Sequence, residues 1–309
     1  MDLDTFLTTL YVMVDDFCQS ELEPEESQPG PQASLSRSEV ITLALFGQWV
    51  HFPSERAFYR YAEHHLRAAF PQLPDRSQFN RVQRKHRDAI TAFALFPVQL
   101  LQAQRCAYEV LDSTAAVTRD AKRRGTGWLA GQADIGWSNR LGWYEGLHLL
   151  LCVTPQGVIT GFGFGSASTH DQHLAATLFA ARHRPSPQLR SCGLPAQGSY
   201  VADKGFAGAR PRLRWHQQYQ VDLVTPPHQS NKRIRWPKAL RRWLASLRQI
   251  IETVNDKLLN TFRLARERPH DLAGFQARLA AKVALHNFCL WFNATLQRES
   301  LAFADLIDW

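Results

Sequence analysis

The sequence predicts an α/β domain, with a mixed sheet flanked by helices, preceded by an all-helical region. The sheet is predicted by short apolar runs at 108–113 and 200–206 that each reach an aspartate, with a hairpin signal between them. The helical region is predicted by apolar residues that recur every three or four positions before residue 104. We therefore expect two domains, 1–104 and 105–309.

Composition limits the class of protein. With 309 residues, 45% hydrophobic and 21% charged, the chain has the composition of a folded globular protein rather than a disordered one. Lys and Arg outnumber Asp and Glu by 36 to 28, and this net charge of +8 favours a polyanionic partner. No signal peptide or membrane-spanning run is expected.

The cysteines indicate the compartment. They are odd in number, far apart and never in a metal-ligand spacing: Cys18, Cys106, Cys152, Cys192 and Cys289. This pattern argues against a disulfide framework or a structural zinc site and favours a reducing compartment. We expect a cytoplasmic, nucleoid-associated protein.

The N-terminal region is expected to hold several helices. Apolar spacing predicts one at 3–22, and the stretch Glu21–Ala33 is rich in Pro, Glu, Gln and Ser, which is typical of an exposed linker. A capping box at Ser36–Glu39 starts the next helix, and further helices are expected from Pro53 and from Asp75.

The helix that begins near Ser77 is basic. It carries side-chain types that contact bases and phosphates, namely Gln78, Asn80, Arg81, Arg84, Lys85 and Arg87. Together with the short helices before it, it resembles a helix-turn-helix DNA-binding region. A solvated helix face explains the helix alone about as well, and the net charge of the chain favours DNA.

The run 108–113 predicts a strand that ends near Asp112, which would place this carboxylate at the rim of a sheet. An aspartate that only caps a turn is the alternative. The basic loop 119–125 follows, and its Lys122, Arg123 and Arg124 would contact phosphates or simply face solvent.

The next elements predict a layered α/β arrangement. In chain order they are a hairpin of 146–153 and 158–164 around a Pro-Gly turn, a helix to His183, the strand that ends at Asp203, a helix at 207–218 and a strand at 221–225. Asp171 lies at the start of the first of these helices, where a cap is the expected role. Ligands of such sheets bind beyond the carboxyl ends of strands, where we expect both Asp112 and Asp203.

The stretch 231–248 is basic and leads into a long helix that begins near Pro237. Its candidate DNA-contacting residues are Lys232, Arg233, Arg235, Arg241 and Arg242. Glu252 lies beside the apolar stripe of this helix, one turn after Arg248. An exposed ion pair between these two residues is the alternative to a role in a site.

The segments Leu111-Asp112-Ser113-Thr114, Val201-Ala202-Asp203-Lys204-Gly205-Phe206 and Arg248-Gln249-Ile250-Ile251-Glu252 resemble the three acidic motifs of DDE transposases of bacterial insertion sequences. The resemblance covers about residues 106–290 and implies a ribonuclease-H-like catalytic core. The chain departs from many relatives at Ala245, where they have Tyr, and at Leu259, where they have Lys; Lys257 would substitute for that Lys.

The resemblance implies a metal-dependent DNA transposase. Asp112, Asp203 and Glu252 would be the catalytic residues and the ligands of two Mg²⁺ ions, or of Mn²⁺ in their place, since hard cations prefer carboxylate oxygens. Lys204, Arg248 and Lys257 would contact phosphates. The partners would be double-stranded DNA, as element ends and as target, and a second copy in a synaptic homodimer. The alternatives are a nuclease or resolvase without strand transfer, and a domesticated DNA-binding protein without enzymatic activity.

Two further features have simpler explanations. Trp128, Trp137 and Trp143 are candidates for stacking on unpaired bases, but core packing or surface burial accounts for most tryptophans. Residues 272–295 predict a closing helix packed on the sheet, and His286 within it is expected to be a core histidine rather than a ligand.

Overall fold

The structure is a computed structural model that describes residues 1–24, 33–120, 129, 131–138, 141–183, 194–227 and 236–309. The N-terminal region is helical as expected, with α1 (Leu3–Ser20), α2 (Arg37–Phe46), α3 (Glu55–His65), α4 (Arg76–Lys85), α5 (Arg87–Phe93) and α6 (Phe96–Leu100). The predicted capping box is present: Ser36 accepts from the Glu39 amide, and Glu39 accepts from the Ser36 amide. The linker predicted at 21–33 falls mostly outside the described residues.

The basic helix that starts at Asp75 is shorter than its apolar pattern suggests. α4 ends at Lys85, and His86 leaves the helical conformation with φ −90° and ψ 12° before α5 begins. The buried residues Phe79, Ile90 and Phe93 all join the same hydrophobic cluster as α10. The break lets short helices, rather than one straight helix, cover that core.

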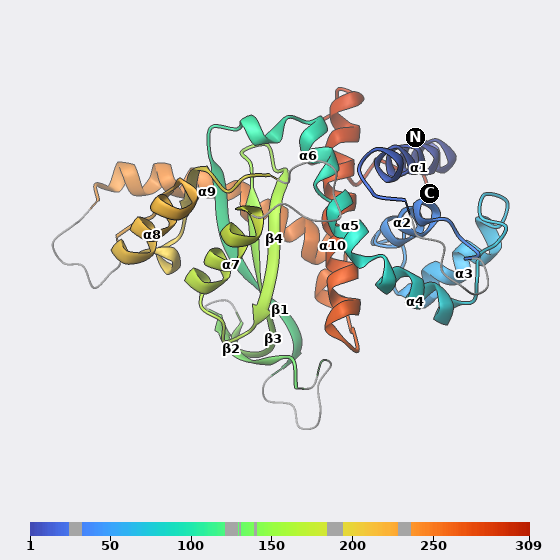
Figure 1. Cartoon of the computed structure of the whole chain (residues 1–309), viewed down its shortest axis with the longest axis horizontal. Helices are drawn as coiled ribbons and strands as arrows, with labels where there is room; N and C mark the ends of the chain where they lie inside the picture. Colours follow the sequence, from blue (N-terminus) through green and yellow to red (C-terminus); the bar gives the residue numbers. More distant parts are fainter. Residues whose placement is uncertain (25–32, 121–128, 130, 139–140, 184–193, 228–235) are drawn as a thin grey trace.

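The sheet is mixed and contains β1 (Glu109–Asp120), β2 (Asp134–Ser138), β3 (Gly142–Val153), β4 (Ile159–Ser166), β5 (Gly198–Ala202) and β6 (Val221–Val224). β1, β5 and β6 are parallel neighbours in the order β1-β5-β6. β3 pairs antiparallel with β1 on one side and with β2 and β4 on the other. This order and these directions confirm the expected α/β class with a ribonuclease-H-like mixed sheet (Figure 1).

The extent predicted for one strand was wrong, and another strand was missed. β1 continues to Asp120, so that Asp112 is its fourth residue rather than its last, because the strand pairs with β3 from Val110 through Asp120. Arg119, expected in a basic loop, therefore belongs to β1 and forms an ion pair with Glu145. β2 was not anticipated from the sequence, and Lys122, Arg123 and Arg124 lie outside the described residues.

Helices cover both faces of the sheet. α7 (Asp171–His183) and α8 (Ala209–Tyr219) pack on one face, around Leu111, Phe179 and Trp215. α9 (Lys238–Asp256), which continues as one π-helical turn at Lys257–Thr261, and α10 (Leu272–Thr295) pack on the other face. Figure 1 shows α10 between the sheet and the N-terminal helices.

A continuous hydrophobic cluster joins the N-terminal helices to the second face of the sheet. It includes Phe6 of α1, Phe46 of α2, Phe288 of α10 and Leu149 of β3. The Phe6 and Phe288 rings meet edge to face with centroids 5.4 Å apart. A boundary at 104/105 stays a prediction. None of the helices in the described part of the chain is long and apolar enough to cross a membrane.

His286 is a core residue, as expected. It is fully buried in α10, and its Nε2 lies 2.8 Å from the carbonyl oxygen of Gly157, to which it donates. Gly157 ends the predicted Thr154–Gly157 turn with φ +88°, a conformation that glycine adopts without strain. Burial lowers the pKa of His286 to about 4. The hydrogen bond thus ties α10 to the β3–β4 turn through a neutral imidazole.

Candidate active site

Strand register brings two of the predicted aspartates together. The parallel ladder between β1 and β5 ends at the pair Leu111 and Ala202. The next residue on each chain segment is an aspartate, so Asp112 and Asp203 follow the last pair side by side. The two aspartates therefore lie at the carboxyl end of the paired part of both strands. Sheets of this kind bind ligands at that position. The sequence prediction that these residues share one rim is consistent with this geometry.

α9 supplies a cation to Asp112. Nη2 of Arg248 donates to Oδ1 of Asp112 at 3.0 Å, and both side chains are mostly buried, with exposures of 23% and 17%. The contact is possible because Asp112 pairs with Leu151, whose side chain faces the core under α9. Nε of Arg248 is buried and has no hydrogen-bond partner among the described residues. Arg248 therefore reaches the predicted site directly.

The segment that follows Asp203 is a tight 3-10 turn, Lys204–Phe206. Oδ1 of Asp203 accepts the Gly205 amide at 2.7 Å and so caps this turn. A side chain at position 205 would force these carboxylates to move, because a Cβ there would lie 2.3 Å from Oδ2 of Asp171 and 2.9 Å from Oδ1 of Asp203. Two carboxylates from different elements therefore flank the same backbone atom.

Asp171 is the residue that sequence reasoning underestimated. Its Oδ1 accepts the hydroxyl of Ser113 at 2.6 Å, and Nε2 of His148 lies 3.4 Å from the same oxygen. The first residue of α7 is thus linked to the residue after Asp112 and to the turn after Asp203. The sequence showed only an aspartate at a helix start; its proximity to β1 depends on packing that no local pattern contains.

The electrostatics of the site reflect three nearby carboxylates. Burial raises the pKa of Asp112 to about 6, the Arg248 guanidinium opposes this rise, and the charges of Asp203 and Asp171 add to it. Arg248 therefore offsets only part of the negative charge of the site. A divalent cation would neutralise the rest. Mg²⁺ prefers carboxylate oxygens as ligands, so the residues present fit the expected metal.

Glu252 is placed differently. It is exposed on α9, one turn beyond Arg248. Within the described ranges, no three or more His, Cys, Asp or Glu side chains are grouped so that they could hold a metal ion. The structure brings Asp112 and Asp203 together with Asp171 nearby, and the role of Glu252 stays a prediction.

Of the three basic residues expected to contact phosphates, two lie beside the aspartates and one does not. Lys204 is exposed beside Asp203, and Arg248 contacts Asp112. Lys257 instead lies over the ring of Phe303, with its nitrogen 5.6 Å from the ring centroid. Its ammonium is thus engaged by the C-terminal segment, where a cation–π contact holds it.

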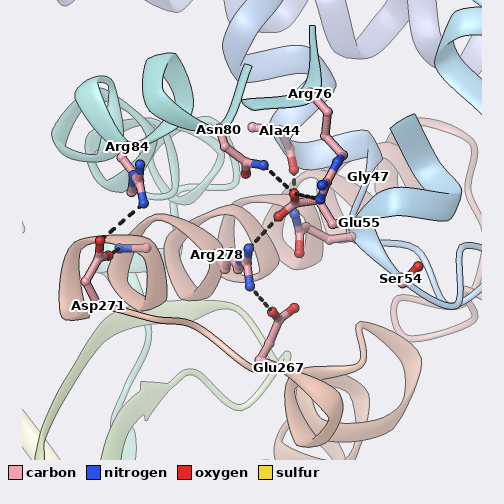
Figure 2. Close-up of polar contacts among 12 residues, drawn as sticks. Ala44, Gly47, Ser54, Glu55, Arg76, Asn80, Arg84, Glu267, Asp271 and Arg278 are labelled. Carbon is pink, nitrogen blue, oxygen red and sulfur yellow. Dashed lines mark hydrogen bonds and ion pairs between the residues drawn. The ribbon is translucent and has the colours of Figure 1, made fainter. Parts of the chain in front are cut away.

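The predicted DNA-contacting residues are mostly exposed where they are described. On α4, Arg81 and Lys85 face solvent, while Arg84 forms an ion pair with Asp271 at 3.2 Å (Figure 2). On α9, Arg241 and Arg242 are exposed. Lys232, Arg233 and Arg235 lie outside the described residues.

A buried ionic network supports the strands behind the site. Arg182 of α7 donates from both terminal nitrogens to Glu109 of β1, each at 3.0 Å, and from Nη1 to the Tyr200 hydroxyl of β5 at 3.1 Å. Thr160 of β4 also donates to Glu109. This bidentate pair joins the two strands that carry Asp112 and Asp203, and fixes α7 on them.

The fold is thus a mixed sheet with Asp112 and Asp203 at the rim of two adjacent parallel strands. Residues 110–288 match the family described as the Transposase DDE domain. The match spans more than half of the chain, which therefore belongs to this family of DDE-type transposases. Among curated proteins, none matches the sequence.

The chain matches two solved structures. One is titled "Crystal structure of a pre-cleavage Mos1 transpososome", with 10% identity, a TM-score of 0.24, and coverage of 78% of this chain and 81% of that chain. The other is titled "Mos1 transposase paired-end complex with left transposon end", with 12% identity, a TM-score of 0.24, and coverage of 79% and 83%.

Proposed function

We propose that this DDE-type transposase hydrolyses a phosphodiester bond at each end of its element and then joins the freed 3′-hydroxyl to target DNA. Both reactions are in-line displacements at phosphorus, so one site can perform them in turn. The observation that carries the proposal is the register of β1 and β5, which sets Asp112 and Asp203 side by side.

In this proposal Asp112 and Asp203 hold the metal, with Glu252 as the third carboxylate ligand. When bound, two Mg²⁺ ions, or Mn²⁺ in their place, supply electrophilic assistance to displacement at phosphorus. Arg248 partly neutralises Asp112 through the contact of 3.0 Å. Its planar donors would also suit a phosphate oxygen of the DNA.

Exposed basic residues of α4 and α9 would bind the duplex. We propose that Arg81 and Lys85 of α4, together with Arg241 and Arg242 of α9, contact backbone phosphates of the element ends or target. Exposed arginines and lysines release counterions from DNA, so binding should weaken steeply with salt. Two ends held together would require a second copy of the chain, as a homodimer in the synaptic complex.

The decisive experiment mixes purified protein with terminal-repeat DNA, a target plasmid and Mg²⁺, and looks for joined product by gel electrophoresis and sequencing of the junctions. We expect joined product with the wild type and none with Asp112→Asn. The control is Asp222→Asn, a change to an exposed aspartate on β6 that pairs with His216. Cleavage without joining would indicate a nuclease or resolvase, and binding without cleavage a non-enzymatic DNA-binding protein.

A further inference from the structure

A basic cavity lies at the junction of the N-terminal helices with the segment 263–278. It has a volume of about 210 Å³, and its walls come from α2, α3, α4, α10 and the turn before α10. A neighbouring cavity of about 200 Å³ shares Glu55, Gln83, Arg268 and Arg278 with it. Figure 2 shows the polar side chains between these helices.

The charges around this cavity do not balance. Among the described residues, its lining contains Arg263, Arg266, Arg268 and Arg278 but only two acids, Glu55 and Glu267. Both acids are already engaged by cations. Arg278 bridges them, with a distance of 3.0 Å to Glu267 (Figure 2), and the buried Lys282 lies 2.7 Å from Glu267.

Arg263 is a buried guanidinium in the wall of the cavity. Its side chain lines the cavity, and the residue is only 6% exposed. Nη2 donates to the Gly47 carbonyl at 3.0 Å, but Nε is buried and has no acceptor among the described residues. Its guanidinium therefore adds a desolvated positive charge to the cavity wall.

We propose that this cavity binds a phosphate-type oxyanion, held by Arg263 and Arg266. An oxyanion would offset the surplus positive charge, and guanidinium groups form the strongest contacts with it. A cation is disfavoured by the excess of arginines. A cavity of about 210 Å³ has room for one phosphate group with its water.

The position of α4 at the cavity suggests two sources for the phosphate. Its Asn80 and Arg76 both contact Glu55 at the wall of the cavity (Figure 2), and the helix also carries the exposed Arg81 and Lys85. The anion is therefore either a backbone phosphate of DNA that lies along α4 or a free phosphate. Neither source depends on the chemistry proposed at Asp112.

The test measures thermal unfolding and calorimetric binding of the full chain with inorganic phosphate, against chloride at equal ionic strength. A ligand that binds only the folded state raises the melting temperature. We expect phosphate to do so, and Arg266→Gln and Arg263→Gln each to lower its affinity about tenfold or more, since each removes a charge-assisted hydrogen bond. The matched control is Arg60→Gln, an exposed arginine of α3 outside the cavity, which should keep wild-type affinity.

Arg263 is buried, so its variant also reports on folding; the exposed Arg266 gives a variant that should fold normally. A random-sequence duplex distinguishes the sources. The ligand is a DNA phosphate if inorganic phosphate competes with the duplex and Arg266→Gln weakens duplex binding. It is a free phosphate if neither inorganic phosphate nor Arg266→Gln changes duplex binding. The proposal is overturned if phosphate stabilises no more than chloride, or if both cavity variants bind phosphate as the wild type does. Either result is independent of whether the protein joins DNA.

Discussion

Arg248 and Asp112 form an ion pair of 3.0 Å between residues that are 136 positions apart in the sequence. Because this contact offsets the charge of a buried carboxylate, Arg248→Gln should raise the pKa of Asp112 above its present value of about 6. We expect the pH profile of cleavage to shift to higher pH and the rate at neutral pH to fall about 10–100-fold, as loss of a charged contact predicts. Arg248→Lys should restore part of the rate.

The control for this prediction is Arg214→Gln, which removes an exposed arginine of α8 that hydrogen-bonds to Gln218. Its pH profile should match the wild type. An unshifted profile for Arg248→Gln would show that the guanidinium does not govern the charge of Asp112.

Glu252 is exposed, so its replacement should separate activity from stability. Glu252→Gln should abolish cleavage while the free energy of unfolding changes by less than about 0.5 kcal/mol, as is usual for surface positions. Asp256→Asn, one turn further along α9, is the matched control and should cleave normally. If Glu252→Gln retains activity while Asp171→Asn loses it, Asp171 supplies the third carboxylate instead.

The turn after Asp203 has no room for a side chain. Gly205→Ala should displace the carboxylates of Asp171 and Asp203, which a Cβ would approach to 2.3 and 2.9 Å. Small displacements of reacting groups cost activity steeply, so we expect a loss of about 100-fold in cleavage rate with only a modest loss of stability. Gly163→Ala on β4, where a Cβ would meet nothing within 4 Å, should remain active. Equal activity of the two variants would contradict the prediction.

Features that depend on neighbouring residues could be predicted from the sequence, whereas features that depend on contacts between distant segments could not. Apolar spacing and capping residues located most helices, because both are local; the Ser36 capping box is one example. The length of β1 was missed because its pairing with β3 is decided across the chain. β2 was missed because it is only five residues long and contains Gly136, and because its two alternating apolar residues, Ile135 and Trp137, face solvent rather than a core.

The candidate site divides in the same way. Asp112 and Asp203 each follow a recognisable apolar run in the sequence, and the register of β1 and β5 places them together. The direction in which Glu252 points depends on how α9 rotates on the sheet, which its periodicity left at the boundary of core and solvent. Asp171 reaches Ser113 across 58 positions, and a helix-start aspartate carries no local signal of such a contact.

The ion pair of Glu109 and Arg182 should be essential for stability but not for chemistry. Both side chains are about nine-tenths buried, so removing one charge leaves the other without compensation. Arg182→Met should lower the free energy of unfolding by about 3–5 kcal/mol, measured by urea denaturation. The double variant Glu109→Gln with Arg182→Met should recover much of this loss. Stability equal to that of the single variant would show that packing of the arginine stem, rather than its charge, is what matters.

His286 should make the protein acid-sensitive. Burial lowers its pKa from 6.5 to about 4 in the folded state. As the pH falls from 6.5 to 4, the unfolded chain takes up a proton that the folded chain excludes, so stability declines, by about 3 kcal/mol once both states are protonated. Above pH 6.5 this contribution is fully present. Unfolding of His286→Gln, followed by fluorescence, should depend less on pH over this interval.

The comparison for His286 is His173→Gln, a change to an exposed histidine of α7, whose stability should keep the pH slope of the wild type. If His286→Gln keeps that slope as well, the acid sensitivity arises from other groups.

The pairing of Leu111 with Ala202 has a consequence for how the gene tolerates insertions and deletions. Neighbouring side chains of a strand point to opposite faces, and here Asp112 meets α9 while Ser113 meets α7. Suppose that one codon between α6 and β1 were removed and that β1 shifted by one residue along β3 and β5. Asp112 and Ser113 would then each point to the opposite face of the sheet. A protein of almost unchanged length and composition would then present a hydroxyl where Arg248 now meets a carboxylate.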